Sequence, residues 1–407
     1  MNEKFSVCQI KREGEGFRKY IYSLFLLSNK ICGMQNKIKI IVDDKIPFIR
    51  NIFEPCAEVL YLPPVQITQD MVADADALVI RTRTKCDERL LSGSSVRFIG
   101  TATIGTDHID IPYCEGQGIT WKNAPGCNAE SVAQYVSSVL ARFSIRDGFK
   151  LHDKTIGIVG VGHVGSRVEQ VCRILGMKVL LNDPLREEAE GSGLFVSLQE
   201  IERECDIISF HTPLTYTGNF PSFHLADDVF FSRLRKRPII INAARGEVVD
   251  TCALLNAFDE KLINDAVIDC WEGEPNIDLR LLDRVYVATP HIAGYSADGK
   301  ANATRTMIDE LARFFGFSLS SQIKVPVPDD TVIDLAGVLD FRIENALLST
   351  YDPMSDSCKL KITPCDFEKL RGNYGLRRES RAYTIRGFKD GEKGVLRELG
   401  FCLENNW

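Results

Sequence analysis

The chain has 407 residues, of which 44% are hydrophobic and 26% charged, as in a globular protein with more than one hydrophobic core. A formal net charge of -7 argues against nucleic acid or an anionic membrane as the partner of the whole molecule. The 13 cysteines are scattered singly, without a CxxC pair or the spacing of zinc ligands, which argues against a disulfide scaffold or a metal site. Such thiols fit a reducing cytoplasm, so we expect a soluble cytoplasmic protein.

Residues 1–36 precede the first regular pattern. An apolar run at 20–27 follows several basic residues, but it is too short to span a bilayer and no small-residue cleavage site follows it. Met34 stands just before the first predicted strand and is a candidate start of translation. We expect residues 1–36 to be an N-terminal extension without ordered structure rather than a targeting segment.

From residue 37 onward, short apolar runs alternate with amphipathic stretches, the rhythm of a parallel sheet flanked by helices. The first candidate strands are residues 38–42, 59–62, 77–80 and 98–102. A long helix is predicted next, with Asn128 as its N-cap. Six further strands, enough for a complete dinucleotide-binding fold, are predicted at 155–159, 178–181, 206–210, 238–241, 265–268 and 285–288. A helix at 297–315 and a linker at 326–330 then precede a smaller unit at 331–407.

The strand at 155–159 is followed directly by Gly-Val-Gly-His-Val-Gly at 160–165. In this pattern the first glycine permits a tight turn, the second lets a pyrophosphate approach the backbone, and the third lets helix and strand pack closely. The helix N-terminus then offers free N–H groups to the phosphates. Asp183 ends the next strand, about 20 residues on, where its carboxylate would bind the adenosine ribose and repel the 2′-phosphate of NADP. The motif therefore predicts an NAD site.

Hydride transfer from a 2-hydroxy acid needs a base for the hydroxyl proton, a group that orients the base, and a cation for the carboxylate. Among six histidines, His291 ends the last strand of the cofactor domain, where ligands bind in such sheets. Two other strand ends supply partners, Arg245 in Asn-Ala-Ala-Arg-Gly and Glu274 in Trp-Glu-Gly-Glu-Pro. The remaining histidines suit supporting positions after strands (His108, His211) or lie in turns and loops (His152, His163, His224).

Arg245, Glu274 and His291, in this order and within these motifs, resemble the D-isomer-specific 2-hydroxyacid dehydrogenase superfamily. Further motifs are similar to the 4-phosphoerythronate dehydrogenase family within it: Ile-Val-Asp-Asp-Lys-Ile-Pro at 41–47, Gly-Thr-Ala-Thr-Ile-Gly-Thr-Asp-His at 100–108, Asn-Ala-Pro-Gly-Cys-Asn at 123–128, Arg-Asp-Gly at 146–148 and His-Ile-Ala-Gly-Tyr at 291–295. The resemblance is strong over 37–317 and weaker in the C-terminal unit, where 367–371, 377–379 and 399–401 resemble the family's dimerisation domain. Residues 1–33 lie outside it.

The resemblance implies how the residues would act. His291 would take the C2 hydroxyl proton as hydride leaves for the nicotinamide, Glu274 would hold the imidazole and stabilise its charged form, and Arg245 would bind the carboxylate and polarise the carbonyl oxygen. The positions that match the family's substrate contacts are Thr82, Thr103 and Tyr295. The positions that match its NAD contacts, together with the glycine motif, are Gly160, Gly162, His163, Val164, Gly165, Asp183, Thr212, Ala243, Ala244, Arg245, Asp269 and Gly294.

The resemblance also implies the domain organisation and the reaction. The fold would be α/β, with a flavodoxin-like substrate domain (37–127 and 295–321) and a Rossmann NAD domain (128–294), both doubly wound parallel sheets, plus a small α+β C-terminal dimerisation domain (331–407). A homodimer would oxidise 4-phospho-D-erythronate to 3-hydroxy-2-oxo-4-phosphooxybutanoate in pyridoxal 5′-phosphate biosynthesis. The cations Arg81, Arg83 and Lys85 would meet the substrate phosphate, unless they form only a solvated basic loop.

Two other functions share this fold. One is 3-phosphoglycerate dehydrogenase, with the same catalytic set; the early motifs and Arg-Arg-Glu at 377–379 argue against it. The other is an NAD-sensing corepressor that binds partner peptides, which fold alone does not exclude. The phosphoerythronate-type motifs favour the metabolic enzyme over this non-enzyme alternative.

Overall fold

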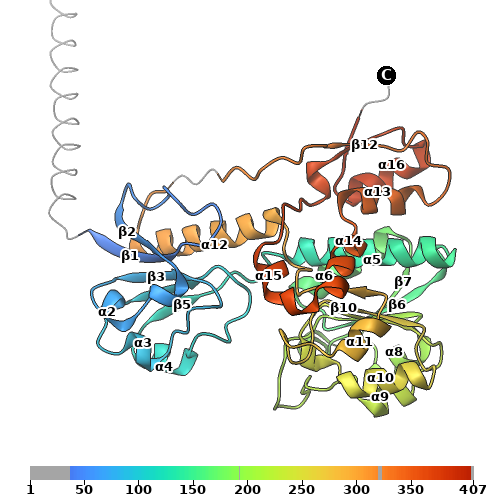
Figure 1. The fold of residues 1–407 in the computed structure, drawn as a ribbon, viewed down its shortest axis with the longest axis horizontal. Coiled ribbons are helices and arrows are strands. Elements are labelled where there is room, and N and C mark those ends of the chain that lie inside the picture. Colours follow the sequence, from blue (N-terminus) through green and yellow to red (C-terminus); the bar gives the residue numbers. More distant parts are fainter. Residues whose placement is uncertain (1–36, 192, 320–322, 405–407) are drawn as a thin grey trace, which may run out of the picture. The chain divides into compact units, whose positions relative to one another are not determined.

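The computed structural model describes residues 37–191, 193–319 and 323–404 (Figure 1). The extension expected at 1–36 lies outside the described residues. Through its internal contacts the chain divides into two compact units. Among the described residues, the first unit comprises 37–100, 107–122 and 310–319, and the second comprises 101–106, 123–309 and 323–404. The finer division into three domains stays a prediction.

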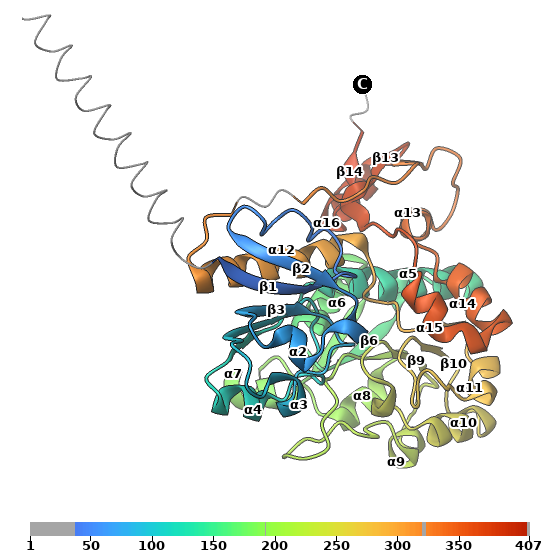
Figure 2. The same ribbon diagram turned by 60° about the vertical axis from the view of Figure 1, so that its left-hand side comes forward.

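The first unit contains a five-stranded sheet in the order β2-β1-β3-β4-β5, built from β1 (Ile38–Asp43), β2 (Ala57–Leu62), β3 (Ala77–Ile80), β4 (Phe98–Thr101) and β5 (Thr120–Lys122). β1 pairs in parallel with both β2 and β3, which lie on either side of it in Figure 2. This order is the flavodoxin-like one, as expected. All four residues of β3 are fully buried, because helices cover both faces of such a sheet. β5 was not predicted, since two of its three residues are only partly buried, the third is exposed, and they form no apolar run.

The helices that lie wholly in the first unit are short. They are the 3₁₀-helix η1 (Pro64–Gln66) and the α-helices α2 (Gln69–Val72), α3 (Glu88–Leu91) and α4 (Ile111–Gly116). Asp87 and Asp110 cap α3 and α4 by accepting backbone N–H groups of the first turn. These caps fix where each helix begins behind its strand.

The second unit contains a six-stranded parallel sheet in the order β11-β10-β9-β8-β6-β7. Its strands are β6 (Thr155–Val159), β7 (Lys178–Asn182), β8 (Ile207–Phe210), β9 (Ile239–Asn242), β10 (Asp265–Ile268) and β11 (Val287–Ala288). β7 lies on one side of β6 and β8 on the other, so the strand order reverses at β6. The loops that follow β6 and β8 therefore flank the crevice where such sheets bind ligands.

Helices follow most of these strands. They are α5 (Ala129–Asp147), α6 (His163–Ile174), α7 (Pro184–Glu190), α8 (Leu198–Glu204), α9 (Asp228–Ser232), α10 (Thr251–Asp259), α11 (Leu279–Arg284) and α12 (Ala297–Phe315), with the 3₁₀-helices η2 (Leu151–Asp153) and η3 (Gly246–Val248). α5 is buried along most of its length, including Val136, Val139 and Leu140. Asn128 precedes α5 as predicted, but its side chain makes no capping hydrogen bond to the described residues. The capping role expected for it is wrong.

The C-terminal part of the second unit adds a small parallel sheet, ordered β12 (Val332–Asp334), β13 (Thr384–Arg386) and β14 (Cys402–Leu403). Around it lie α13 (Arg342–Thr350), α14 (Pro353–Ile362), α15 (Phe367–Gly372) and α16 (Lys393–Glu398), with the 3₁₀-helices η4 (Pro364–Asp366), η5 (Ser380–Ala382) and η6 (Asp390–Glu392). Ile333 and Leu347 share one hydrophobic core with Val139 of α5, which is why this part clusters with the NAD-type sheet. Among the described helices, none has the length and apolar character needed to cross a membrane.

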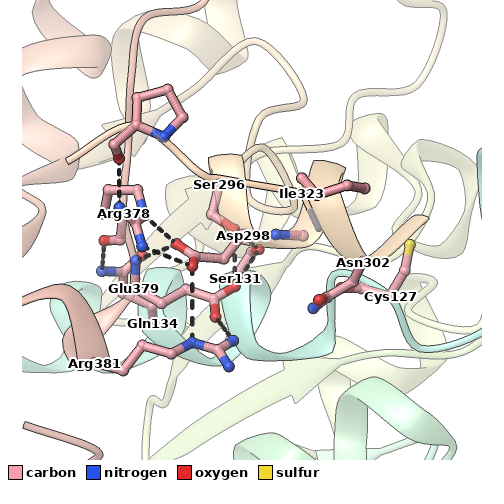
Figure 3. Close-up of polar contacts among 12 residues, drawn as sticks. Cys127, Ser131, Gln134, Ser296, Asp298, Asn302, Ile323, Arg378, Glu379 and Arg381 are labelled. Atoms are coloured by element: carbon pink, nitrogen blue, oxygen red, sulfur yellow. Dashed lines mark hydrogen bonds and ion pairs between the residues drawn. The ribbon is translucent and has the colours of Figure 1, made fainter. Parts of the chain in front are cut away.

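A buried polar network ties the C-terminal segment to the starts of α5 and α12 (Figure 3). The carboxylate of Glu379 accepts hydrogen bonds from Ser131 (3.2 Å) and Ser296 (2.8 Å). Asp298 accepts from the Arg378 guanidinium (2.8 Å) and from the Glu379 amide (3.0 Å). Removing one member of such a buried pair typically costs about 3–5 kcal/mol, so the network fixes where the segment attaches.

Candidate active site

The carboxyl ends of β10 and β11 bring together an imidazole and a carboxylate. His291 Nδ1 lies 2.6 Å from Glu274 Oε1, and both side chains are about one quarter exposed, at 23% and 25%. Burial opposes ionisation of Glu274, but the hydrogen bond and charge of His291 and the charge of Arg371 outweigh it and lower the pKa of the carboxyl below its usual 4.5. The pair therefore combines an ionised carboxylate with an imidazole whose other nitrogen, Nε2, is not used in this bond. This is the arrangement of an oriented general base.

The loop that carries His291 is held by buried hydrogen bonds. The His291 amide donates to the carbonyl oxygens of Asp269 (2.8 Å) and Thr289 (3.0 Å). The fully buried Asp269 carboxylate accepts from Thr289 Oγ1 (2.7 Å) and from the amides of Ile292 (2.8 Å) and Ala293 (3.0 Å). Burial raises the pKa of Asp269 although these bonds and the charge of His291 lower it. Asp269, expected from the sequence as an NAD contact, thus anchors the loop of His291.

Arg245 stands in the loop after β9, and Asn242 builds this loop. Its side-chain amide donates to Arg245 O (2.9 Å) and Cys270 O (3.2 Å), and its oxygen accepts from Ala244 N (3.2 Å). A Cβ atom on Gly246 would lie 2.1 Å from the Trp271 carbonyl, so only glycine permits this close approach to the β10 loop. The loop that carries Arg245 therefore packs closely against the segment that leads from β10 to Glu274.

The charges of four site residues act on the buried thiol of Cys270. Burial, followed by the charges of Asp269 and Glu274, raises the pKa of the Cys270 thiol, and the cations Arg245 and Arg371 act in the opposite direction. The thiol therefore stays protonated and serves as a small apolar group, not as a nucleophile.

Arg371, on α15, is a candidate site residue that the sequence did not indicate. Its Nε donates to the Tyr295 hydroxyl (3.0 Å), and its Nη1 lies 3.8 Å from Glu274 Oε1. The Tyr295 ring also packs edge-on against Tyr374, with ring centroids 6.1 Å apart. The motif at 367–371 indicated only a dimerisation domain, because nothing local shows that a residue 76 positions away reaches Tyr295.

The glycine turn has the geometry that a dinucleotide needs. Gly160 has a φ of 87°, and a Cβ there would lie 2.7 Å from Thr212 N, so the turn after β6 touches the loop after β8. A Cβ on Gly165 would lie 2.0 Å from Gly160 O, which requires glycine for close helix packing. A Cβ on Gly162 would meet nothing within 4 Å, which leaves open space at the N-terminus of α6 for a pyrophosphate.

Two polar groups beside this turn fit the rest of NAD. The Asp183 carboxylate accepts hydrogen bonds from the Val161 amide (2.8 Å) and the Arg186 amide (3.1 Å), so it is held at the end of β7 with lone pairs to spare for ribose hydroxyls. Thr212 Oγ1 is buried and has no hydrogen-bond partner among the described residues. Asp183 follows β7 and Thr212 follows β8, the two strands next to β6, where the strand order reverses. Because dinucleotides bind at this point of such sheets, these two residues fit NAD.

The remaining site predictions are divided between the two units. Thr103 lies in the second unit, where Thr101 Oγ1 is 2.6 Å from its hydroxyl and Asn123 bonds the neighbouring Ile104 carbonyl (2.7 Å). Thr82 and the cations at 81–85 lie in the first unit. There, Arg81 donates to the Lys45 carbonyl (3.2 Å). Their part in substrate binding stays a prediction.

The histidines that the sequence did not favour as the base are also placed by the structure. His211 is partly buried, its Nε2 lies 2.9 Å from Ser209 Oγ, and desolvation lowers its pKa to about 3, so it is neutral. His224 lies in a loop, as expected, but both of its ring nitrogens contact carboxylates, those of Glu272 (2.7 Å) and Asp250 (3.1 Å). His163 is the first residue of α6, and its ring lies against Gly126.

Comparison with known proteins agrees with this geometry. The profile of the family "D-isomer specific 2-hydroxyacid dehydrogenase, NAD binding domain" matches residues 130–293. The chain is 54% identical over 349 residues to the erythronate-4-phosphate dehydrogenase of Bacteroides fragilis, covering 86% of this chain and 99% of that protein. It is 46% identical to the protein of the same name from Porphyromonas gingivalis (89% and 100% covered) and 40% identical to that of Yersinia pestis (90% and 100%).

Solved structures are similar at lower identity. One is the D-lactate dehydrogenase of Aquifex aeolicus, complexed with NAD and lactic acid, at 26% identity and a TM-score of 0.55, covering 69% of this chain and 96% of that chain. Another is the NAD⁺-bound 3-phosphoglycerate dehydrogenase of Entamoeba histolytica, at 27% identity and a TM-score of 0.58, covering 72% and 99%. The structural likeness thus extends to several substrates, whereas the higher identities are all to proteins of one name.

Proposed function

Because the chain belongs to the erythronate-4-phosphate dehydrogenases, a branch of the D-isomer-specific 2-hydroxyacid dehydrogenases, we propose that its site oxidises 4-phospho-D-erythronate with NAD. The product is 3-hydroxy-2-oxo-4-phosphooxybutanoate, and the reaction is a step of pyridoxal 5′-phosphate biosynthesis. The single observation that carries the chemistry is the 2.6 Å contact between His291 and Glu274, in the loops that follow strands of the sheet that also carries the glycine turn.

His291 takes the proton of the C2 hydroxyl while the C2 hydrogen leaves as hydride. The ionised Glu274 holds the imidazole and stabilises the positive charge that the proton brings. NAD, when bound, accepts the hydride at its nicotinamide. Arg245 binds the substrate carboxylate and polarises the oxygen that becomes the carbonyl, for which its planar fork of donors is suited. Fixed groups of the protein thus stabilise the charges that develop at the reacting carbon.

Tyr295 and the threonines Thr82 and Thr103 contact the substrate in this proposal. Arg371 holds the Tyr295 hydroxyl and stands 3.8 Å from Glu274, so it positions both rather than reacting itself. The substrate phosphate needs cations other than Arg245, which is committed to the carboxylate. We assign it to the loop of Arg81, Arg83 and Lys85. Binding energy from this remote phosphate raises kcat as well as lowering KM, because it holds C2 against the nicotinamide.

The enzyme acts in the cytoplasm as a homodimer in this proposal. The cysteines described in the structure are unpaired thiols, which suits a reducing compartment. The C-terminal part exposes large apolar side chains, among them Leu339 (85% exposed) and Ile362 (78%). A second copy of the chain that covers these side chains would remove them from water.

The proposal is tested by kcat/KM for 4-phospho-D-erythronate, D-erythronate, 3-phosphoglycerate and D-lactate. The phosphorylated four-carbon acid should be preferred to each of the others by at least about a hundredfold. Charge reversal at Arg83 and Lys85 should remove much of the preference over D-erythronate. If 3-phosphoglycerate is oxidised best, the substrate is wrong while the chemistry stands. If none of the four is oxidised, the chain is not an enzyme of this type and the corepressor alternative moves ahead.

A further inference from the structure

The loop after β8 leads to His224, a histidine for which the sequence indicated no role. This loop begins near Thr212, one of the predicted NAD contacts. Its middle is bonded to itself, because the Thr215 amide donates to Ser222 Oγ (2.8 Å) and the Ser222 amide donates to the Thr215 carbonyl (3.0 Å). The ring of Phe223 then stacks on that of His224, with centroids 3.9 Å apart. The loop is therefore an ordered segment that presents His224.

The backbone of His224 is bonded to the segment that follows Arg245. Its φ of 49° lies in the left-handed region, which a histidine adopts only at some cost, so surrounding contacts must hold it there. The His224 amide donates to the Glu247 carbonyl (2.7 Å). Two residues later, the Ala226 amide donates to the Val248 carbonyl (3.1 Å). The loop after β8 and the segment after β9 are thus joined at this histidine.

The imidazole of His224 lies between two carboxylates. Its Nε2 is 2.7 Å from Glu272 Oε1, and its Nδ1 is 3.1 Å from Asp250 Oδ2. A neutral imidazole has one hydrogen to donate, whereas an imidazolium has one for each carboxylate. The three side chains are only 26–29% exposed, so solvent screens their charges less than it screens an ion pair on an open surface. The histidine therefore bridges two acidic segments of the chain.

Glu272 carries this bridge into the loop of Glu274. Burial raises the pKa of Glu272, but hydrogen bonds from His224 and Thr251, with the charge of the imidazole, outweigh it and lower the pKa below its usual 4.5. The second oxygen of Glu272 accepts from the Thr251 amide (3.1 Å), so both oxygens are bonded. A Cβ on Gly246 would stand 2.4 Å from the Glu272 nitrogen, so the backbones also pack closely. The side chain and the backbone of Glu272 are both held in place.

The turn 271–274 sets the position of the carboxylate that orients the proposed base. The Trp271 amide donates to Glu274 Oε2 (3.3 Å), while Glu274 Oε1 faces His291 Nδ1 at 2.6 Å. The Trp271 indole donates to the Thr289 carbonyl (2.9 Å), which also accepts from the His291 amide (3.0 Å). The pair of Glu274 and His291 is thus held through this turn, and a displacement of about 1 Å can slow a reaction by about a hundredfold.

We propose that His224 is a positioning residue of the oxidation: by binding Glu272 it holds the turn 271–274 and so keeps the Glu274 carboxylate against His291. This inference rests on the proposed function, which assigns Glu274 and His291 their roles. His224 acts through Glu272 and not on the substrate. The loops that it joins follow β8, β9 and β10, the strands after which most of the predicted cofactor and substrate contacts stand.

The rate of hydride transfer in a single turnover, followed by the absorbance of NADH, tests this role. His224→Asn suits the left-handed backbone, but its shorter, uncharged side chain does not reach Glu272. The variant should slow the transfer by about tenfold and leave KM for the hydroxy acid within about twofold, because the substrate contacts are unchanged. Glu272→Ala should slow it equally, and the double variant should be no slower than either. The matched control is His152→Asn, at an exposed histidine 3.5 Å from Asp153, which should have no effect.

The route of the effect is tested in the Glu274→Gln enzyme. There the carboxylate that His224 keeps in place has already lost its charge, so His224→Asn should change the rate by less than about twofold. A role in folding alone would lower the rate by the same factor in both backgrounds, and the Tm of each variant reports folding directly. A His224→Asn enzyme with the wild-type rate, or an equal loss in both backgrounds, overturns the proposal.

Hydrogen exchange separates this proposal from the proposed function. Backbone amides of 271–274 should exchange faster in His224→Asn than in the wild type, and at the wild-type rate in His152→Asn, whether or not the enzyme turns over. If the wild type oxidises none of the four acids, the proposed function fails, while exchange still shows whether His224 holds the turn. Unchanged exchange at 271–274 in His224→Asn overturns the positioning role.

Discussion

At the scale of single residues, the conformation of His291 depends on its partners. Its φ of 54° lies in the left-handed region, which residues other than glycine adopt rarely. Such strain persists only where surrounding contacts fix it, and it concentrates at functional sites. Here Asp269 and Thr289 hold the amide and Glu274 holds the ring. The backbone and side chain of the proposed base are therefore both set before substrate arrives.

Replacing Glu274 tests this orientation. Glu274→Gln should lower kcat by about a hundredfold or more, within the usual contribution of a positioned acid–base group. Glutamine has no charge to stabilise the protonated imidazole, so the pH profile of the reductive reaction should also move to lower pH. Because the pKa of Glu274 lies below 4.5, the wild-type pair stays intact across an assay range above pH 5. Steady-state kinetics over this range give both values, and an unchanged kcat would contradict the assignment.

His211 makes stability depend on pH. Burial lowers its pKa from 6.5 to about 3, so between these values the unfolded chain binds a proton that the folded chain does not. The folded state therefore loses stability as pH falls below 6.5, by up to about 1.4 kcal/mol per pH unit from this group.

This pH dependence of stability is tested by measuring the Tm of the protein between pH 7.5 and pH 5. His211→Gln should flatten the fall of Tm with pH, whereas His152→Gln, at a side chain that is 66% exposed, should leave the slope unchanged. Identical slopes in all three proteins would mean that another group controls the acid sensitivity.

At the scale of elements, the turn between β6 and α6 separates a structural from a functional glycine. Gly165→Ala should destabilise the fold by about 1–3 kcal/mol or more, because its Cβ would overlap Gly160 O at 2.0 Å. Gly162→Ala should leave the Tm near that of the wild type, since its φ of −75° suits alanine and nothing lies within 4 Å.

The same two variants differ in cofactor binding. Gly162→Ala should weaken NADH binding by about tenfold, because the added methyl group occupies the approach to the pyrophosphate. Fluorescence titration with NADH and thermal unfolding of both variants provide the check. Unchanged NADH affinity in a folded Gly162→Ala protein would argue that the cofactor does not pass over this turn.

At the scale of the whole molecule, the C-terminal part packs against α5 and is also proposed to form the homodimer interface. It shares a core with α5 through Ile333 and Leu347, so removing residues 331–407 would expose that core and would not give a simple monomer. The homodimer is better tested by surface substitutions. Light scattering should give the wild type twice the 45.6 kDa mass of the chain, and Leu339→Glu with Ile362→Glu should give the single mass.

Melting temperature controls for folding of that double variant. Both side chains are exposed within the chain, so the monomer should remain folded. A wild type that is already monomeric, or a double variant that remains dimeric, would contradict the proposed interface.

The sequence by itself determined the two α/β sheets, the glycine turn, NAD as the cofactor and the family. These features depend on local patterns: β3, β6 and β10 have the predicted bounds within about one residue because each is a short apolar run between turns. The chemistry of Arg245, Glu274 and His291 was indicated because each follows a strand, and parallel strands place their carboxyl ends at one edge.

Only the tertiary structure decided which distant residues complete this arrangement. Arg371 reaches Tyr295 across 76 positions, and Arg377 reaches Ala293 across 84, from a segment whose sequence indicated no role beyond dimerisation. Asn128 fails to cap α5, and the short β5 forms although it carries no apolar run. Each of these outcomes depends on long-range packing, which the local periodicity of a chain does not specify.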